Sequence, residues 1–169
     1  MERDRAAFAE LSRRRGCPVV SATEAILESL RHVGARRVAV VSPYPAWLTE
    51  AALRYWRDAG IAVVEVAQVV QVGAQAATGS SDTRKVYNVT SANALVDARR
   101  LRCRDADAIL LSGTGMPTLG AIGGISRAFG KPMLSSNLCL RWMLGAKLGP
   151  RGDPPWDDRA AWEALLDRL

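Results

Sequence analysis

Residues 37–44, Arg-Val-Ala-Val-Val-Ser-Pro-Tyr, decide the fold. The unbroken apolar run at 38–41 is typical of a strand that is buried on both faces of a parallel sheet. Residues 47–59 then have helical spacing before Gly60, and the β-branched run at 61–66 predicts a second strand. A strand, a helix and a strand in this order predict two parallel strands joined by a crossover helix.

The same alternation continues along the chain. Further strands are predicted at 108–111 and 132–134, and a short extended segment at 17–20. Further helices are predicted at 5–15, 21–33, 91–101, 118–129, 138–148 and 157–169, and residues 68–88 form a long polar connection. We therefore expect an α/β fold, a parallel sheet with crossover helices on both faces. One domain is predicted over 1–169, with an N-terminal helix (1–15), a core (16–149) and a C-terminal tail helix (150–169).

Composition excludes several classes of protein. Three cysteines and one histidine in 169 residues rule out a disulfide scaffold and a Cys/His zinc site. No apolar run is long enough to cross a bilayer, and the charged start at 1–5 is not that of a signal peptide. These features predict a protein of the reducing cytoplasm with no membrane partner.

The formal net charge of +6 suggests a nucleic-acid partner, but the distribution of charge speaks against one. Basic residues alternate with acidic ones along the chain, and dense basic runs occur only at 13–15 and 99–104. Solvated helix ends explain these runs better than a phosphate track does. We therefore expect no nucleic-acid partner.

The carboxyl ends of parallel strands are where α/β proteins bind ligands. Three predicted strands end in neutral polar residues, at 42–44, 112–115 and 135–137. Ser42, Ser112, Ser136 and Asn137 are the side chains that these ends offer to a ligand. Hydroxyls, amides and backbone N–H groups suit a small anion.

The segment Ser112-Gly113-Thr114-Gly115 is the sharpest of these features. Its two glycines permit close approach of a ligand to the backbone, and the helix that follows supplies unpaired N–H donors. An ordinary strand-to-helix turn explains the same residues. The segment is neither a phosphate-binding P-loop nor a dinucleotide fingerprint, because Lys-Ser/Thr and the third glycine are both missing.

Two side chains near the strand ends are candidates for chemistry. Tyr44 lies between two prolines, so its phenol could donate to a carboxylate or act as an acid, or simply pack. Cys139 lies near the start of a helix that Asn137 can cap, where a thiolate is stabilised, although a small buried hydrophobe is the alternative. Cys17 and Cys103 fall at the opposite ends of their strands.

Several stretches together resemble the aspartate/glutamate racemase superfamily. They are Val19–Leu27 with Gly34–Tyr44, Asp107–Ser112, and Gly130–Asn137 followed by Trp142. The similarity is strongest to the branch of maleate cis-trans isomerase and arylmalonate decarboxylase, and it covers most of residues 16–149. It implies two facing α/β lobes, of which this chain resembles mainly the second.

The resemblance also implies a function. A member of this family would act without a cofactor as an isomerase, racemase or decarboxylase, next to the carboxylate of a small acid. Tyr44 matches a tyrosine that donates to the substrate carboxylate, Thr114 and Gly115 match residues beside the catalytic thiol, and Asn88 matches a substrate-binding asparagine. Tyr44 is therefore one predicted catalytic residue, and Cys139, which matches no family residue, is the other because it is the thiol at a strand's carboxyl end.

Two departures from the family weaken this prediction. Gly113 stands where the family has a catalytic cysteine, and Thr114 is too weakly acidic to replace a thiol. The first lobe has no counterpart in residues 1–15, which suggests a shortened protein or a fragment. A non-catalytic protein that binds small carboxylates, or an incomplete domain that needs a partner lobe or forms a homo-oligomer, is therefore the alternative.

Overall fold

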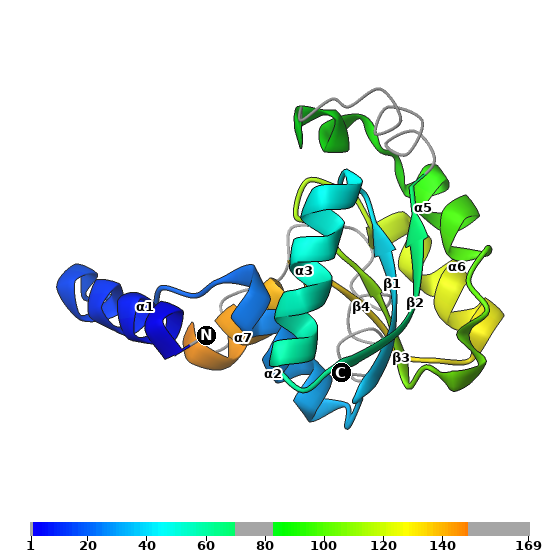
Figure 1. Ribbon diagram of the computed structural model, residues 1–169. Helices are drawn as coiled ribbons and strands as arrows, with labels where there is room; N and C mark the ends of the chain where they lie inside the picture. Colours follow the sequence, from blue (N-terminus) through cyan, green and yellow to red (C-terminus); the bar gives the residue numbers. More distant parts are fainter. Residues whose placement is uncertain (1, 70–82, 149–169) are drawn as a thin grey trace.

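The computed structural model describes residues 2–69 and 83–148. Its centre is a sheet of four strands in the order β2-β1-β3-β4, and all neighbouring strands are parallel (Figure 1). The strands are β1 (Arg37–Ser42), β2 (Ala62–Gln68), β3 (Ala108–Leu111) and β4 (Met133–Ser135). The predicted parallel α/β sheet is confirmed.

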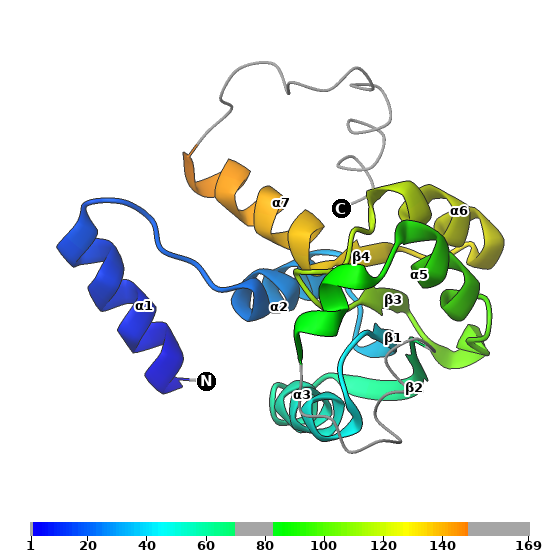
Figure 2. The same cartoon turned by 90° about the horizontal axis from the view of Figure 1, so that it is seen from above.

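Helices cover both faces of this sheet. One face carries α2 (Ala22–His32), α3 (Ala46–Asp58) and α7 (Ser136–Leu148), and the other carries α5 (Ser91–Ala98) and α6 (Leu119–Phe129) (Figure 2). Two short 3-10 turns, η1 (Thr83–Asn88) and η2 (Cys103–Asp105), precede α5 and β3. Because consecutive parallel strands need crossovers, this layering places every strand's carboxyl end at one edge of the sheet.

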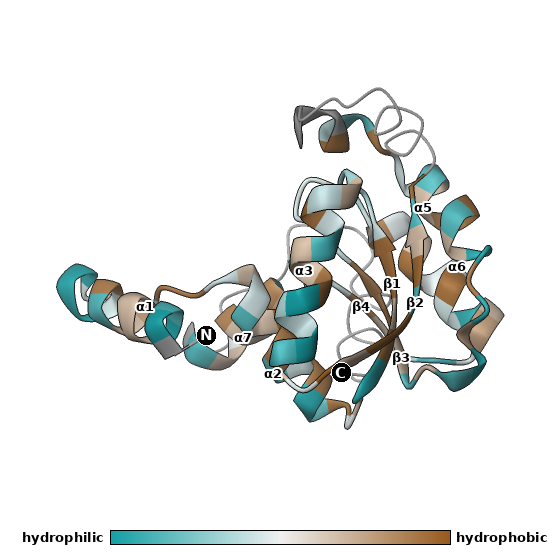
Figure 3. Cartoon of the chain, in the orientation of Figure 1, coloured by the Kyte–Doolittle hydropathy of each residue, from teal (hydrophilic) through white to brown (hydrophobic). Residues whose placement is uncertain are grey.

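The two central strands form the middle of the core. Every residue of β3 is buried, and so are all residues of β1 after Arg37. Figure 3 shows these strands as the most hydrophobic part of the ribbon. In the edge strand β2, exposed and partly buried residues alternate as far as Val66 and only Ala67 is buried, as expected for a strand that is covered less completely. Each fully buried Val, Leu or Ile stabilises the fold by about 1.5–3 kcal/mol relative to exposure.

Helix ends follow local sequence rules in most places. Ser21 Oγ accepts a hydrogen bond from the Glu24 N–H at 3.0 Å and so caps α2. Gly130 ends α6 in a left-handed conformation with φ of 60°. The predicted extended segment at 17–20 contains no strand. The tail helix and most of the polar connection lie outside the described residues, and the division into 1–15, 16–149 and 150–169 stays a prediction.

The N-terminal helix α1 (Glu2–Arg15) extends away from the body of the molecule (Figures 1 and 2). Most of its described residues are exposed. Arg5 approaches Glu24 and Glu28 of α2, at 3.8 and 3.7 Å. Ion pairs of this exposed kind contribute little to stability, typically under about 1 kcal/mol.

Asp107 connects two strands at the amino edge of the sheet. One of its carboxylate oxygens accepts hydrogen bonds from the backbone N–H groups of Arg36 and Arg37, at 2.9 and 2.8 Å. These two bonds lower the pKa of the Asp107 carboxyl below its ordinary value of 3.8. The carboxylate therefore fixes the start of β1 against the start of β3.

We predict that Asp107→Ala lowers the free energy of unfolding at pH 7 by about 1 kcal/mol, because two charge-assisted hydrogen bonds are lost. The folded-state pKa is depressed, so this stabilisation is present above pH 3.8 and is lost as the pH falls through the folded-state pKa. Urea unfolding between pH 7 and pH 3 measures the difference. Asp105→Ala, an exposed neighbour, is the control. A difference that does not shrink in acid would contradict the assignment.

Candidate functional site

The three predicted strand ends meet in space. The Gly113 N–H donates to Ser136 Oγ at 3.0 Å, which joins the end of β3 to the start of α7. Asn137 Nδ2 donates to the Thr114 carbonyl at 3.1 Å and adds a second link. The Gly113 backbone also lies directly against Pro43 and Tyr44. We call residues 42–44, 112–115 and 135–137 the cradle.

Gly113 sets the shape of the cradle. Its φ is +106°, a conformation that residues with a side chain rarely adopt. A Cβ at this position would lie 2.8 Å from Pro43 Cγ and 3.3 Å from Tyr44 Oη. Backbone conformation and crowding therefore both select glycine at position 113. As a result, the Tyr44 hydroxyl faces the Gly113 backbone with no side chain between them.

Tyr44 is held in place by its own backbone. Its N–H donates to Ser42 Oγ at 3.3 Å, and its carbonyl accepts from Gln68 Nε2 at 2.8 Å and from Thr49 Oγ1 at 3.2 Å. Burial raises the pKa of the half-buried phenol, Tyr87 raises it further, and a hydrogen bond with the Thr114 backbone lowers it in part. The phenol is therefore neutral at pH 7 and can donate a proton in a hydrogen bond.

Ser42 and Ser112 lie beneath the cradle surface. Both residues are buried, and Ser42 Oγ is 2.7 Å from Thr49 Oγ1. The Ser112 N–H donates to the Val41 carbonyl at 2.9 Å and continues the sheet ladder. Ser42 positions Tyr44 by accepting the hydrogen bond from the Tyr44 N–H. Direct contact between Ser42 and a ligand stays a prediction.

Tyr87 of η1 covers the far side of the cradle. A Cβ on Gly115 would lie 2.8 Å from a ring carbon of Tyr87 and 3.0 Å from Val86 Cγ1. The Tyr87 side chain is nevertheless 72% exposed, so the ring shields one side of the loop and faces solvent with the other. The neighbouring Asn88 is exposed at the end of η1, and its predicted ligand contact stays a prediction.

The prediction that Asn137 caps α7 is wrong. Helix α7 begins at Ser136, and Ser135 Oγ accepts the hydrogen bond from the Leu138 N–H at 3.2 Å. The Asn137 amide binds the Thr114 carbonyl instead. The serine run allows the cap to form two residues earlier, which leaves the Asn137 amide free to cross to the neighbouring loop.

Cys139 lies in the core, where α7 packs on α2. Its side chain is fully buried and interacts with Ser29 of α2 and the Ser135 backbone. Burial raises the pKa of the Cys139 thiol to about 11, which is opposite in direction to the stabilised thiolate expected at a helix start. This environment suits a packing residue, and a catalytic part for Cys139 stays a prediction.

The sequence did not predict three contacts of the cradle. Thr49 and Gln68 hold the Tyr44 carbonyl, and Tyr87 packs against Gly115. Gln68 could have been found as the last residue of a strand, at the same sheet edge as the cradle. Nothing in the spacing of Thr49 or Tyr87 indicates their contacts.

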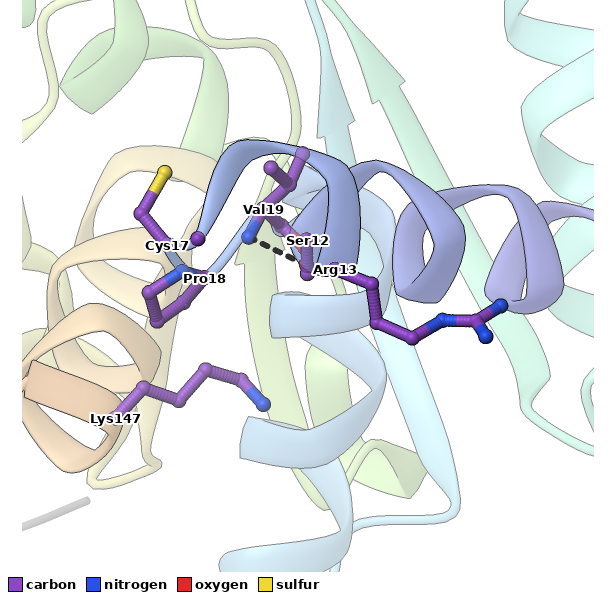
Figure 4. Close-up of a pocket in the computed structure, with 7 residues that line it drawn as sticks. Ser12, Arg13, Cys17, Pro18, Val19 and Lys147 are labelled. Atoms are coloured by element: carbon purple, nitrogen blue, oxygen red, sulfur yellow. Dashed lines mark hydrogen bonds between the residues drawn. The ribbon is translucent and has the colours of Figure 1, made fainter.

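An open cavity of about 510 Å³ lies elsewhere, where the end of α1 approaches the end of α7. Figure 4 shows Cys17, Pro18 and Lys147 on one side, with Arg13 directed away from them. Arg13 forms an ion pair with Glu10, and Ser12 Oγ accepts from the Val19 N–H at 2.9 Å. Arg13 is thus paired with a residue outside the cavity, and none of the predicted site residues lines this cavity.

Within residues 2–69 and 83–148, no helix is long and apolar enough to span a membrane. The same ranges contain no cluster of three or more His, Cys, Asp or Glu side chains placed to hold a metal ion. What the cradle presents is a neutral phenol, hydroxyls and backbone amides. Neutral donors of this kind can bind a carboxylate through hydrogen bonds, without a positively charged side chain.

Comparison with known proteins gives consistent matches. The sequence profile of the arylmalonate decarboxylase family matches residues 2–158. Maleate isomerases of Geobacillus stearothermophilus and Alcaligenes faecalis are 28% and 29% identical over 80% and 78% of this chain. The chain spans 51% and 49% of their lengths, which is about half of each.

Solved structures agree with these matches. A maleate isomerase from Pseudomonas putida crystallised with maleate is 29% identical, with a TM-score of 0.69, over 78% of this chain and 50% of its own. Nocardia farcinica maleate cis-trans isomerase, with a covalently bound succinylcysteine intermediate, is 26% identical, with a TM-score of 0.74, over 87% and 58%. An arylmalonate decarboxylase, 23% identical with a TM-score of 0.75, shares the fold over 92% and 65%.

We predict that Gly113→Ala destabilises the protein more than Gly130→Ala does. Both glycines have positive φ, but nothing lies within 4 Å of a Cβ on Gly130, whereas one on Gly113 would meet Pro43. In both variants an alanine must adopt a positive φ, which destabilises the folded state. Only Gly113→Ala also overpacks its surroundings, which lowers the free energy of unfolding by roughly a further 1–3 kcal/mol. Denaturant unfolding of both variants measures the difference. Equal losses would show that Pro43 moves aside freely.

Proposed function

Because the chain belongs to the arylmalonate decarboxylase family, in the branch of the aspartate/glutamate racemase superfamily that also holds maleate isomerase, we propose that the cradle binds the carboxylate of a small organic acid. The observation that carries the proposal is the placement of the Tyr44 hydroxyl against the bare Gly113 backbone. A neutral donor in a half-buried loop is the kind of group that a carboxylate oxygen accepts from.

The rest of the cradle supports this binding mode. The hydroxyl of Ser136 is buried and occupied by the Gly113 N–H, so it keeps the loop in shape. Thr114 and Asn137 are exposed beside it and can reach a ligand. Among the described residues, only Tyr87 adds an electrostatic contribution to the pKa of Tyr44, so the neutral state of the phenol does not depend on a charged neighbour.

Cofactor-independent isomerisation, racemisation or decarboxylation of that acid is the second candidate function. Similarity to maleate isomerases over most of the chain favours it. A relative holds a succinylcysteine intermediate, and the resemblance gives Gly113 the place of a catalytic thiol. Covalent catalysis by a thiol needs the thiolate, and Cys139, with its raised pKa and buried side chain, does not supply one. Within residues 2–69 and 83–148, Tyr44 is then our candidate for the acid.

We predict that Tyr44→Phe weakens the binding of maleate by about 10-fold or more, because one hydrogen bond to a charged group is lost. Isothermal titration calorimetry of maleate against the purified chain measures the change. Tyr55→Phe is the matched control, since Tyr55 lies on α3 and its ring packs edge-on against Trp56. Unchanged affinity in Tyr44→Phe would remove the phenol from the carboxylate site.

We predict that turnover is slower than in a maleate isomerase assayed in parallel by 10²–10⁴-fold or more, since loss of general acid–base catalysis has effects of roughly that size. Proton NMR in D₂O detects isomerisation, decarboxylation or deuterium uptake with maleate, an arylmalonate, a hydantoin, aspartate and glutamate. Cys139→Ser should leave any residual rate unchanged. Turnover as fast as that of the maleate isomerase would contradict the prediction of a slow rate. Loss of turnover in Cys139→Ser would show that Cys139 takes part in the reaction.

A further inference from the structure

Tyr87 is an exposed aromatic side chain on an anchored turn. Its neighbours Val86 and Val89 are only 6% and 2% exposed, whereas Tyr87 is 72% exposed. The Val89 N–H donates to the Val86 carbonyl at 3.2 Å and closes the turn of η1. Ser91 Oγ then donates to the Pro117 carbonyl at 2.9 Å, which ties the start of α5 to the loop that follows β3. Packing therefore fixes the backbone around Tyr87 and leaves its ring at the surface.

Tyr87 and Tyr44 contact the same short stretch of backbone. A Cβ on Gly115 would lie 2.8 Å from Cε1 and 3.1 Å from Cδ1 of the Tyr87 ring. A Cβ on Gly113 would lie 3.3 Å from the Tyr44 hydroxyl oxygen. Two residues of chain span at most about 7 Å, so the two side chains meet the loop after β3 close to each other. They come to it from different elements, Tyr44 from the end of β1 and Tyr87 from η1.

The electrostatics of the two phenols agree with this placement. Tyr87 raises the pKa of Tyr44 by direct electrostatic interaction, an effect that weakens with distance. The Thr114 backbone lowers the pKa of Tyr44, as an N–H group does when it donates to the phenol oxygen. Because Tyr44 is the acceptor in that bond, its own O–H proton stays available to a ligand.

One carboxylate can accept from two hydroxyls at once, because each of its two oxygens is an acceptor. The interaction of Tyr87 with Tyr44 is electrostatic and not a hydrogen bond, so the two hydroxyls are not joined directly. Hydrogen bonds of about 2.7 Å to each carboxylate oxygen would bridge them.

We propose that Tyr87 supplies a second hydroxyl donor to the cradle, so that one carboxylate lies between the phenols of Tyr44 and Tyr87. This inference rests on the proposed binding of a carboxylate by the cradle and adds a residue from outside the three strand ends. One carboxylate oxygen accepts from Tyr44 and the other from Tyr87. Because Tyr87 is exposed, water competes for its hydroxyl, and its contribution to affinity is smaller than that of Tyr44.

Calorimetric titration with maleate and with crotonate, a monocarboxylate of the same chain length, tests the proposal. Tyr87→Phe keeps the ring that packs on Gly115 and removes only the hydroxyl. This variant should bind both acids more weakly by a similar factor, roughly 3- to 10-fold, because one hydrogen bond to the shared carboxylate is lost. Its free energy of unfolding, measured in urea, should stay unchanged. Tyr55→Phe is the matched control, and its affinity for both acids should equal that of the unmodified protein.

The outcomes separate this inference from the proposed function. Unchanged affinity in Tyr87→Phe, together with weaker binding in Tyr44→Phe, would overturn the role of Tyr87 and leave the cradle as the carboxylate site. A loss for maleate alone would also overturn it, since Tyr87 would then hold the second carboxylate. Unchanged affinity in both variants, or no binding of either acid, would refute the proposed function and this inference together.

Titration of the phenols by ultraviolet absorbance tests the placement without a ligand. The chain has three tyrosines, so single tyrosine-to-phenylalanine variants assign each ionisation. The pKa of Tyr44 should fall in Tyr87→Phe, because the group whose charge raises it is removed. Tyr55→Phe should leave the pKa of Tyr44 unchanged. The same Tyr44 pKa with and without the Tyr87 hydroxyl would show that the two phenols do not share a site and would overturn the proposal.

Discussion

The close approach of the Gly113 backbone to Pro43 and Tyr44 is the constraint on which the cradle depends. Parallel strands bring the ends of β1 and β3 to one sheet edge, but only a residue without a side chain lets the two loops touch there. The hydrogen bond from the Gly113 N–H to Ser136 Oγ then fixes the end of β4 to the same point. One backbone position thus holds three strand ends together, and the fixed Tyr44 hydroxyl is the result.

Periodicity was enough to predict the sheet. The apolar runs at 38–41 and 108–111 are buried on both faces in the structure, and such runs have few alternatives to a central parallel strand. The strand ends of the cradle followed from the same rule, since strand direction fixes where they lie. The resemblance to the racemase superfamily, drawn from short motifs, is confirmed by the family match over residues 2–158.

Side-chain partners were beyond the reach of the sequence. Whether Asn137 caps a helix or crosses to Thr114 depends on a helix start that shifts by one or two residues. The burial of Cys139 depends on α2, a helix more than 100 residues earlier, which supplies Ser29. Thr49 and Gln68 reach the Tyr44 carbonyl only because α3 and β2 pack beside it. Contacts of this kind are set by packing, on which local patterns carry no information.

The electrostatics of the site separate recognition from chemistry. Burial raises the pKa of both Tyr44 and Cys139, so each group keeps its proton at neutral pH. A protonated phenol is a good hydrogen-bond donor and a poor base, so the cradle can hold a carboxylate but cannot itself abstract a proton from the neighbouring carbon. Under the proposed function, the cradle therefore binds the acid and does not itself abstract the proton. The relatives are about twice as long as this chain, and proton abstraction in such a site requires a base from beyond the cradle.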